Sequence, residues 1–290
     1  MNLNTKEIFR KANDGSYAIP QLNVSSADQM KAVVEAAKKL KSPVMFGTSG
    51  GEAKFLGLRQ AVVLSEFYEK ELGVDVILNA DHTKTLDAIK EYLDTGYNSI
   101  HFDGSLLPYE ENLELTKKAV LMAREISEDI SVEGELGQIG GTGSSKVFDE
   151  EIKIKEEYLT NPEQALEFVT ATGVDRLGVS IGNMHGISKA AMPKLDMERL
   201  SELQEILKGK CILVLHGASG IPDEDVKKSV ELGIRKINVN TELRVAFSSA
   251  IKTKLDEGEI TPYKFIAPAQ EEMQKVVEEK MLICGSNNKS

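Results

Sequence analysis

The stretch Val74-Asp-Val-Ile-Leu-Asn-Ala-Asp-His82, followed by Lys84–Thr95 and by Ser99-Ile-His-Phe102, decides the fold class. Its first part is a short apolar, β-branched run that ends on polar residues. The middle part has apolar residues at the spacing of an amphipathic helix, and the last part is a second apolar run. A strand, a helix and a second strand in that order predict a right-handed βαβ unit with parallel strands.

The same pattern recurs along the whole chain and predicts eight strands that alternate with helices. The expected strands are Tyr17–Leu22, Pro43–Gly47, Val74–Leu78, Ser99–Phe102, Ile130–Val132, Arg176–Val179, Ile212–Leu215 and Lys236–Val239. The expected helices are Ala27–Leu40, Leu58–Leu72, Lys84–Thr95, Asn112–Ile126, Pro162–Thr172, Met197–Leu207, Asp223–Leu232 and Thr241–Asp256. We predict an α/β fold, a (β/α)₈ TIM barrel formed by residues 1–290 as a single domain. The pattern alone leaves an open, doubly wound sheet as the alternative. Two more helices are expected, a short one at Thr5–Ala12 under the barrel and an extra C-terminal one from Pro268 to Met281.

Composition excludes several classes of partner. The net charge of −11 argues against nucleic acid, since binding the phosphate backbone requires a surplus of Lys and Arg. No apolar run approaches the roughly 20 residues of a membrane span, and the N-terminus has no signal-peptide pattern. The two cysteines, Cys211 and Cys284, show no disulfide spacing, so we expect a reduced, cytoplasmic protein.

Polar side chains follow the predicted strands, and three of the four histidines in the chain are among them. In a barrel these positions converge on the C-terminal face, where active sites of this fold lie. Three histidines with an open fourth position are typical of a catalytic zinc site. His101 lies inside a predicted strand, and we interpret it as a packing residue. The polar residues at the strand ends are Asn23, Ser49, Asp81, His82, Asp103, Glu133, Glu135, Asn183, His185, His216, Asn238 and Asn240.

Two small-residue segments near the end of the predicted barrel indicate an anion site. His216–Gly220 follows the seventh strand, and Asn238–Thr241 follows the eighth and begins a helix. Backbone amides of such loops, together with a helix N-terminus, bind phosphate groups. A third segment, Gly137–Ser145, is rich in glycine and is interpreted as a mobile lid.

At these residues the sequence resembles the class II, zinc-dependent aldolases that cleave fructose 1,6-bisphosphate or tagatose 1,6-bisphosphate. The matching stretches occur in family order over nearly the whole chain. They are Asp81-His82, Asp103-Gly104-Ser105, Val132–Gly137, Gly182–Gly186, Leu215–Gly220, Asn238–Leu243 and Glu279–Met281 with Gly285-Ser286.

The resemblance implies a role for each candidate residue. His82, His185 and His216 would bind one catalytic Zn²⁺ per subunit, with Glu135 as a nearby or alternate ligand, and Asp81 would transfer the C4 hydroxyl proton. It also implies dihydroxyacetone phosphate as product, a monovalent cation (Na⁺ or K⁺) beside its phosphate, and a homodimer or homotetramer. The residues expected to bind the phosphate are Gly186, Lys189, Gly217, Ser219, Asn238 and Thr241, and those expected elsewhere around the substrate are Asn23, Ser49, Asp103, Asn183 and Asn240.

The residues are consistent with metal chemistry. Cleavage of the C3–C4 bond leaves an enediolate, whose negative charge a Lewis acid stabilises. The alternative aldolase chemistry uses a lysine that forms a Schiff base, and no predicted strand has a lysine near its C-terminal end.

Four positions depart from the family pattern. Asn79 stands where a histidine is usual, Thr142-Gly143-Ser144 replaces an acidic pair in the lid, and Asn240 replaces Asp or Ala. Tyr263 stands in place of an arginine that reaches the far phosphate across a subunit interface. The resemblance implies fructose 1,6-bisphosphate as the default substrate. Because of these departures, tagatose 1,6-bisphosphate and a ketose 1-phosphate are alternatives. A third interpretation is a barrel that binds phosphosugars without turnover.

Overall fold

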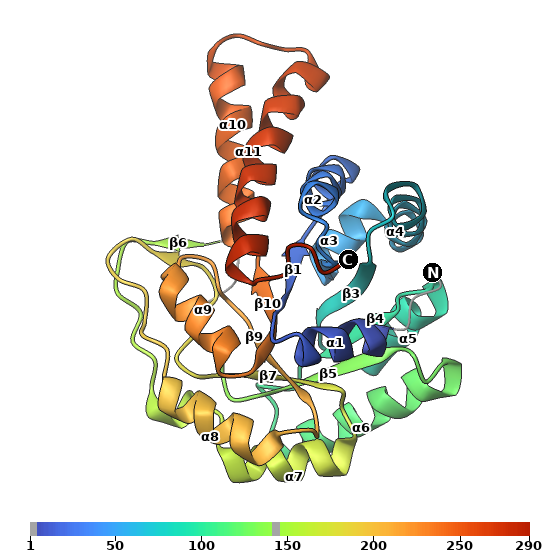
Figure 1. Cartoon of the computed structure of the whole chain (residues 1–290), viewed down its shortest axis with the longest axis vertical. Coiled ribbons are helices and arrows are strands. Elements are labelled where there is room, and N and C mark those ends of the chain that lie inside the picture. The colour runs from blue at the N-terminus through green and yellow to red at the C-terminus, as the bar shows by residue number, and fades with distance from the viewer. Residues whose placement is uncertain (1–4, 141–145) are drawn as a thin grey trace.

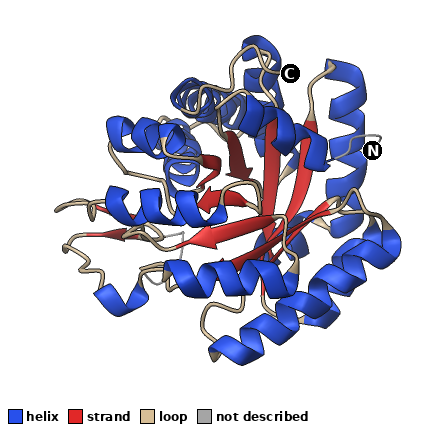
Figure 2. Ribbon diagram, turned by 60° about the horizontal axis from the view of Figure 1, so that its bottom comes forward, coloured by secondary structure: helices blue, strands red, loops and turns tan. Residues whose placement is uncertain are grey.

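The computed structural model describes residues 5–140 and 146–290, and it confirms the predicted (β/α)₈ barrel (Figures 1 and 2). Eight parallel strands close in the order β1-β10-β9-β7-β5-β4-β3-β2. They are β1 (Ile19–Asn23), β2 (Val44–Ser49), β3 (Val76–Thr83), β4 (Ser99–Phe102), β5 (Ser131–Leu136), β7 (Arg176–Val179), β9 (Ile212–Leu215) and β10 (Ile234–Val239). Two short strands, β6 (Val147–Phe148) and β8 (Ile187–Ser188), pair outside the barrel.

Helices surround the barrel strands (Figure 2). Apolar side chains are buried between these helices and the strands. They are α1 (Thr5–Asp14), α2 (Ala27–Leu40), α3 (Gly50–Leu56), α4 (Leu58–Leu72), α5 (Leu86–Thr95), α6 (Tyr109–Ile126), α7 (Pro162–Thr172), α8 (Met197–Leu207), α9 (Asp223–Glu231), α10 (Thr241–Asp256) and α11 (Pro262–Ile283), with a 3₁₀ turn at Glu156–Tyr158. Local sequence sets their ends. In α2, the Ser26 hydroxyl accepts a hydrogen bond from the Gln29 amide, and Lys41 ends the helix in the left-handed conformation.

Helices α10 and α11 form a hairpin that projects away from the barrel (Figure 1). The predicted start of the C-terminal helix at Pro268 is wrong. The helix begins at Pro262. Proline is favoured at this first position because the N–H groups of the first turn have no acceptor within the helix, so the N–H that proline lacks is not missed. Pro268 lies inside the helix. Ile260 and Tyr263, near the turn of the hairpin, are largely exposed.

Several strands extend further toward the C-terminal face of the barrel than their apolar runs indicate. β3 continues through Asp81 and His82, and β5 includes both Glu133 and Glu135, so these polar residues lie within strands and not after them. Their side chains line a polar barrel interior, which an apolar run cannot reveal. Helix α3 was not predicted; its start at Ser49 is stabilised by Glu52, whose carboxylate accepts the Ser49 N–H at 2.8 Å.

The barrel interior contains fully buried charges. Lys236 Nζ lies 2.8 Å and 3.1 Å from the two carboxylate oxygens of Glu133, and Arg176 Nε lies 3.0 Å from Glu133 Oε2. All three side chains are inaccessible to solvent. The apolar core lies mainly between the strands and the surrounding helices. Within residues 5–140 and 146–290, no helix combines the length and apolar character that a membrane span requires.

Candidate active site

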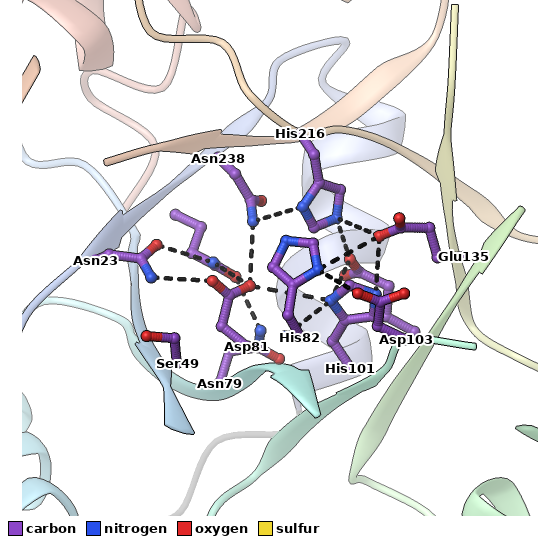
Figure 3. A network of polar contacts seen from close by, with 12 residues as sticks. Asn23, Ser49, Asn79, Asp81, His82, His101, Asp103, Glu135, His216 and Asn238 are labelled. Atoms are coloured by element: carbon purple, nitrogen blue, oxygen red, sulfur yellow. Dashed lines mark hydrogen bonds and ion pairs between the residues drawn. The ribbon is translucent and has the colours of Figure 1, made fainter. Parts of the chain in front are cut away.

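Predicted site residues from several strands meet at the C-terminal ends of the barrel strands (Figure 3). Ten of the predicted residues line a cavity of about 30 Å³, which is room for one ion or water. A bound substrate would need these side chains to move apart. The residues that line the cavity are Asn23, Asp81, His82, His185, Gly186, Gly217, Ser219, Asn238, Asn240 and Thr241.

Asp81 is held by amide donors on two sides. Gln21 Nε2 donates to Oδ1 at 2.9 Å, Asn23 Nδ2 donates to Oδ2 at 2.9 Å, and Asn238 Nδ2 lies 3.3 Å from Oδ1. Burial acts to raise the pKa of the carboxyl, but nearby His82, His101 and Lys236 outweigh burial and hold this pKa well below its ordinary value. Asp81 is therefore an ionised, oriented carboxylate at neutral pH.

Two of the three predicted ligand histidines are each oriented by a carboxylate. His82 Nδ1 donates to Asp103 Oδ2 at 2.8 Å, so its Nε2 is left to bind a metal. His216 Nε2 donates to Glu133 Oε1 at 2.8 Å, and Asn238 Nδ2 lies 3.1 Å from His216 Nδ1, which leaves Nδ1 as the acceptor. A carboxylate on the far nitrogen of a ligand histidine is a recurrent feature of metal sites.

His185 lies on the loop after β7, with its ring centroid 4.9 Å from that of His82 and 6.3 Å from that of His216. Burial, together with the neighbouring His82 and His216, lowers the pKa of His185 to about 3. Its imidazole is therefore neutral and keeps the lone pair that a metal requires.

His101 is fully buried, but it faces the site and not an apolar neighbour (Figure 3). Its Nε2 lies 3.2 Å from Glu135 Oε2, and its ring centroid lies 4.7 Å from that of His82. An interpretation as a packing residue does not account for these polar neighbours. Sequence alone could not decide, because β4 alternates between the helices and the barrel interior.

Histidine and carboxylate side chains form two groups close enough to hold a divalent metal ion, and neither group includes His185. Potential ligand atoms of Asp81, His82, His101 and His216 lie within 4.8 Å of one another, as do those of His82, Asp103 and Glu135. Glu135 Oε2 and His101 Nε2 are buried and have no hydrogen-bond partner of good geometry. Such atoms are costly unless something binds them. Several imidazoles with carboxylates suit Zn²⁺ better than Mg²⁺.

The opposite wall of the cavity is formed by the loops predicted to bind phosphate. Gly217 has a φ of +64°, and a Cβ atom there would lie 2.1 Å from the Met184 carbonyl oxygen, so only glycine fits. The Ser219 hydroxyl accepts from the amides of Asn240 and Glu242 at 3.3 Å each, which joins this loop to the start of α10.

Six of the predicted site residues do not line the cavity: the predicted metal ligands His216 and Glu135, which lie behind it, and four predicted substrate-binding residues. Lys189 Nζ pairs with Asp149 at 2.8 Å, and the side chain is largely exposed. The Asn183 amide donates to the His216 carbonyl at 2.9 Å, Ser49 donates to Glu52, and Asp103 supports His82 from behind. Residues 141–145 of the predicted lid lie outside the described residues.

Sequence reasoning did not assign roles to several residues behind the site. Glu52 accepts hydrogen bonds from Asn23 at 2.9 Å and from Arg244 at 2.6 Å. Gln21 bridges Asp81 and Asn79, with its Oε1 accepting from Asn79 at 2.9 Å. Because the side chains of a strand alternate, Gln21 shares a face with Asn23, and that spacing is a signal by which it could have been found.

A larger cavity of about 660 Å³ lies at the other end of the barrel, where Lys6, Arg10 and Arg235 are among the lining residues. It contains none of the histidines. Volume alone would favour that cavity, but the chemistry favours the small one, because histidines line only the small one among the described cavities, together with a carboxylate of lowered pKa, Asp81.

A closed barrel with histidines and carboxylates gathered at its C-terminal face has the architecture of a TIM-barrel enzyme. The family model of fructose-bisphosphate aldolase class-II matches residues 3–289, and the chain belongs to this family. The YdjI aldolase from Escherichia coli K12 is 31% identical in sequence, with 98% of this chain and 97% of that chain covered and a TM-score of 0.83. The fructose-bisphosphate aldolase from Campylobacter jejuni is 26% identical, with 98% and 95% covered and a TM-score of 0.80.

Proposed function

We propose that the protein catalyses the metal-dependent, reversible aldol cleavage of a ketose bisphosphate, with fructose 1,6-bisphosphate as the default substrate, to dihydroxyacetone phosphate and an aldehyde. The observation that carries the proposal is the position of Asp81 in one small cavity with His82 and His185 and with the phosphate-type loop at Gly217. Family membership supports a lyase that acts on phosphosugars.

The residues in and around the cavity have separate roles in the proposed reaction. Asp81 accepts the proton of the C4 hydroxyl as the C3–C4 bond breaks and returns one in condensation. Asn23 and Gln21 keep its carboxylate oriented. The amides around Gly217 and at the start of α10 suit the C1 phosphate, and a monovalent cation beside it stays a prediction.

A Zn²⁺ ion held by His82, His185 and His216 would supply the Lewis acid that stabilises the enediolate. Asp103 and Glu133 orient His82 and His216 for this task. Glu135 stays a predicted alternate ligand. Its Oε2 lies 3.7 Å from His82 Nδ1 and 4.0 Å from His216 Nε2, the two nitrogens that donate to Asp103 and Glu133.

The barrel interior offers Lys236 as a candidate for the competing Schiff-base chemistry. Its pKa is lowered by burial, despite the opposing effect of Glu133. A neutral lysine is the form that attacks a carbonyl. However, its ammonium group is paired with both oxygens of Glu133, and none of the described residues that line the cavity is a lysine.

Chelation distinguishes these two chemistries. We expect a chelator to abolish cleavage of fructose 1,6-bisphosphate and Zn²⁺ to restore it, measured in a coupled assay with metal content determined in parallel. Borohydride added with substrate should leave the protein unlabelled. A mass increase on Lys236 after borohydride treatment would contradict the metal mechanism.

A ketose 1-phosphate is the second candidate substrate, because the far-phosphate position has no arginine. Tyr263 lies on the projecting hairpin with most of its side chain exposed, and Lys264 Nζ lies 3.7 Å from Glu259. Arg244 is nearer to the site through Glu52, which also bonds Asn23. Arg244 is thus the better candidate to contact a second phosphate.

We expect the preference for fructose 1,6-bisphosphate over fructose 1-phosphate to be modest. One charge-assisted hydrogen bond contributes about 1.5–3 kcal/mol, which corresponds to roughly 10–100-fold in binding. The measurement is kcat/KM for both ketoses and for tagatose 1,6-bisphosphate. Arg244→Gln should reduce the preference and Lys264→Gln should not. A preference above about 10³-fold that survives Arg244→Gln would contradict this view.

The hairpin also supports a homo-oligomer, either a dimer or a tetramer. Val245, Leu255 and Ile260 are exposed apolar residues on or beside α10. Burial of such residues against a second copy is favourable. Both cysteines are free thiols, which is consistent with a reducing, cytoplasmic location.

A further inference from the structure

His101 contacts two separate parts of the site, and the mechanism above assigns it no task. It lies in β4, fully buried, in contact with residues from β3 and β5 (Figure 3). The backbone N–H of His82 donates to His101 Nδ1 at 3.2 Å. On the other side of the ring, Nε2 lies 3.2 Å from Glu135 Oε2.

The first contact stabilises an unusual backbone. His82 has a φ of +49°, in the left-handed region that residues other than glycine rarely adopt. The pairing of β3 with β4 shifts register between Ala80 and Thr83, so the ordinary ladder is interrupted there. The His82 N–H donates to the His101 side chain and not to a backbone carbonyl of the neighbouring strand. This conformation aims the His82 ring at the cavity, and it persists only if its surroundings hold it.

The second contact is between His101 Nε2 and Glu135 Oε2. Glu135 Oε2 and His101 Nε2 are both buried, and neither has a hydrogen-bond partner of good geometry. Because Nδ1 accepts the His82 N–H, a ring proton lies at Nε2, the nitrogen that faces Glu135. A small movement of the Glu135 carboxylate would therefore complete a bond that both groups need.

We propose that His101 is a positioning residue of the metal site, which holds the His82 backbone through Nδ1 and the Glu135 carboxylate through Nε2. The inference rests on the proposed function, because it assumes that His82 and Glu135 face a metal ion. It predicts that one ring sets the distance between two ligands from different strands.

The two contacts can be separated by substitution. Asparagine at position 101 keeps an acceptor near Nδ1, glutamine keeps a donor near Nε2, and leucine keeps neither. The probe is Co²⁺ added to the metal-free full-length protein, with its affinity measured by titration and its ligand field by visible absorption. Ile100→Val, at the preceding residue of β4, which is buried on the other face of the strand, is the matched control. Thermal unfolding of each metal-free variant reports folding.

We expect His101→Leu to weaken Co²⁺ binding by roughly 10–100-fold, the usual range for residues behind the ligands, and to change the spectrum. His101→Asn and His101→Gln should each recover part of the affinity, and Ile100→Val should match the wild type. If His101→Leu is unfolded, the Asn and Gln variants decide.

Wild-type affinity and spectrum in the Leu variant, or in both the Asn and Gln variants, would overturn the inference and leave the proposed function intact. Equal losses in all variants, Ile100→Val included, would show that β4 needs only its packing and would also overturn the inference. A wild-type protein that binds no Co²⁺ would instead overturn the proposed function and the inference with it.

Discussion

Replacement of Asp81 by alanine is expected to lower kcat by about 10²–10⁴-fold, the usual contribution of a positioned acid or base, while the protein retains its metal. The carboxylate lies among amide donors from Gln21, Asn23 and Asn238, so it is oriented toward the cavity and stays ionised. The measurement is kcat for cleavage together with metal content. Asp94→Asn, an exposed carboxylate on α5, is the control.

The variant must also be separated from a folding defect. Loss of Asp81 leaves amide donors without an acceptor, which costs about 1–3 kcal/mol for each buried group. Asp81→Asn keeps the shape of the side chain and removes its charge, so it should fold better and remain inactive. Near-normal turnover in Asp81→Asn would assign the proton transfer to another group.

Replacement of His185 by alanine is expected to release the metal and abolish cleavage. We expect this variant to be the most informative of the three histidine variants. The described contacts of the His185 ring are ring contacts with His82 and His216 and include no hydrogen bond, so its removal should disturb the fold least. His82→Ala and His216→Ala should also lose the metal, but they also leave Asp103 or Glu133 without a partner.

The readouts are metal content after dialysis and kcat/KM with added Zn²⁺. The loss of metal affinity should exceed the roughly 10–100-fold that changes behind the ligands cause. Exposed Lys118→Ala serves as the control, since Lys118 pairs with Glu114 on the surface of α6. A His185→Ala protein that keeps one equivalent of metal and its activity would remove His185 from the ligand set.

The sequence predicted the architecture because alternating strands and helices have different hydrophobic periods. The sequence also predicted that most of the cavity residues lie close together. The C-terminal ends of barrel strands converge even when the exact first residue of each strand is unknown. The strand ends themselves were placed too early. Asp81, His82, Glu133 and Glu135 continue their strands with polar side chains that face a charged barrel interior, and an apolar pattern ends before them.

Other features depend on three-dimensional distances that no pattern contains. Lys189 matches the family motif, yet its side chain reaches Asp149 and not the cavity. His101 has the neighbours of a buried strand residue in sequence, but its ring meets Glu135 from the adjacent strand. Glu52 lies in a short helix that begins with two glycines, Gly50 and Gly51. Glycine has a low helix propensity, so the sequence pattern did not predict this helix.

The ion cluster in the barrel interior constrains how this sequence can diverge. Glu133 contacts Lys236, Arg176 and His216, and all four side chains are inaccessible to solvent. Removal of one partner of a buried pair costs about 3–5 kcal/mol, whereas joint replacement by apolar residues can be neutral. Substitutions at these positions should therefore be fixed together in descendant lineages. In an alignment of relatives, positions 133, 176 and 236 should covary as a group. A substitution at only one of them should mark a protein with reduced stability.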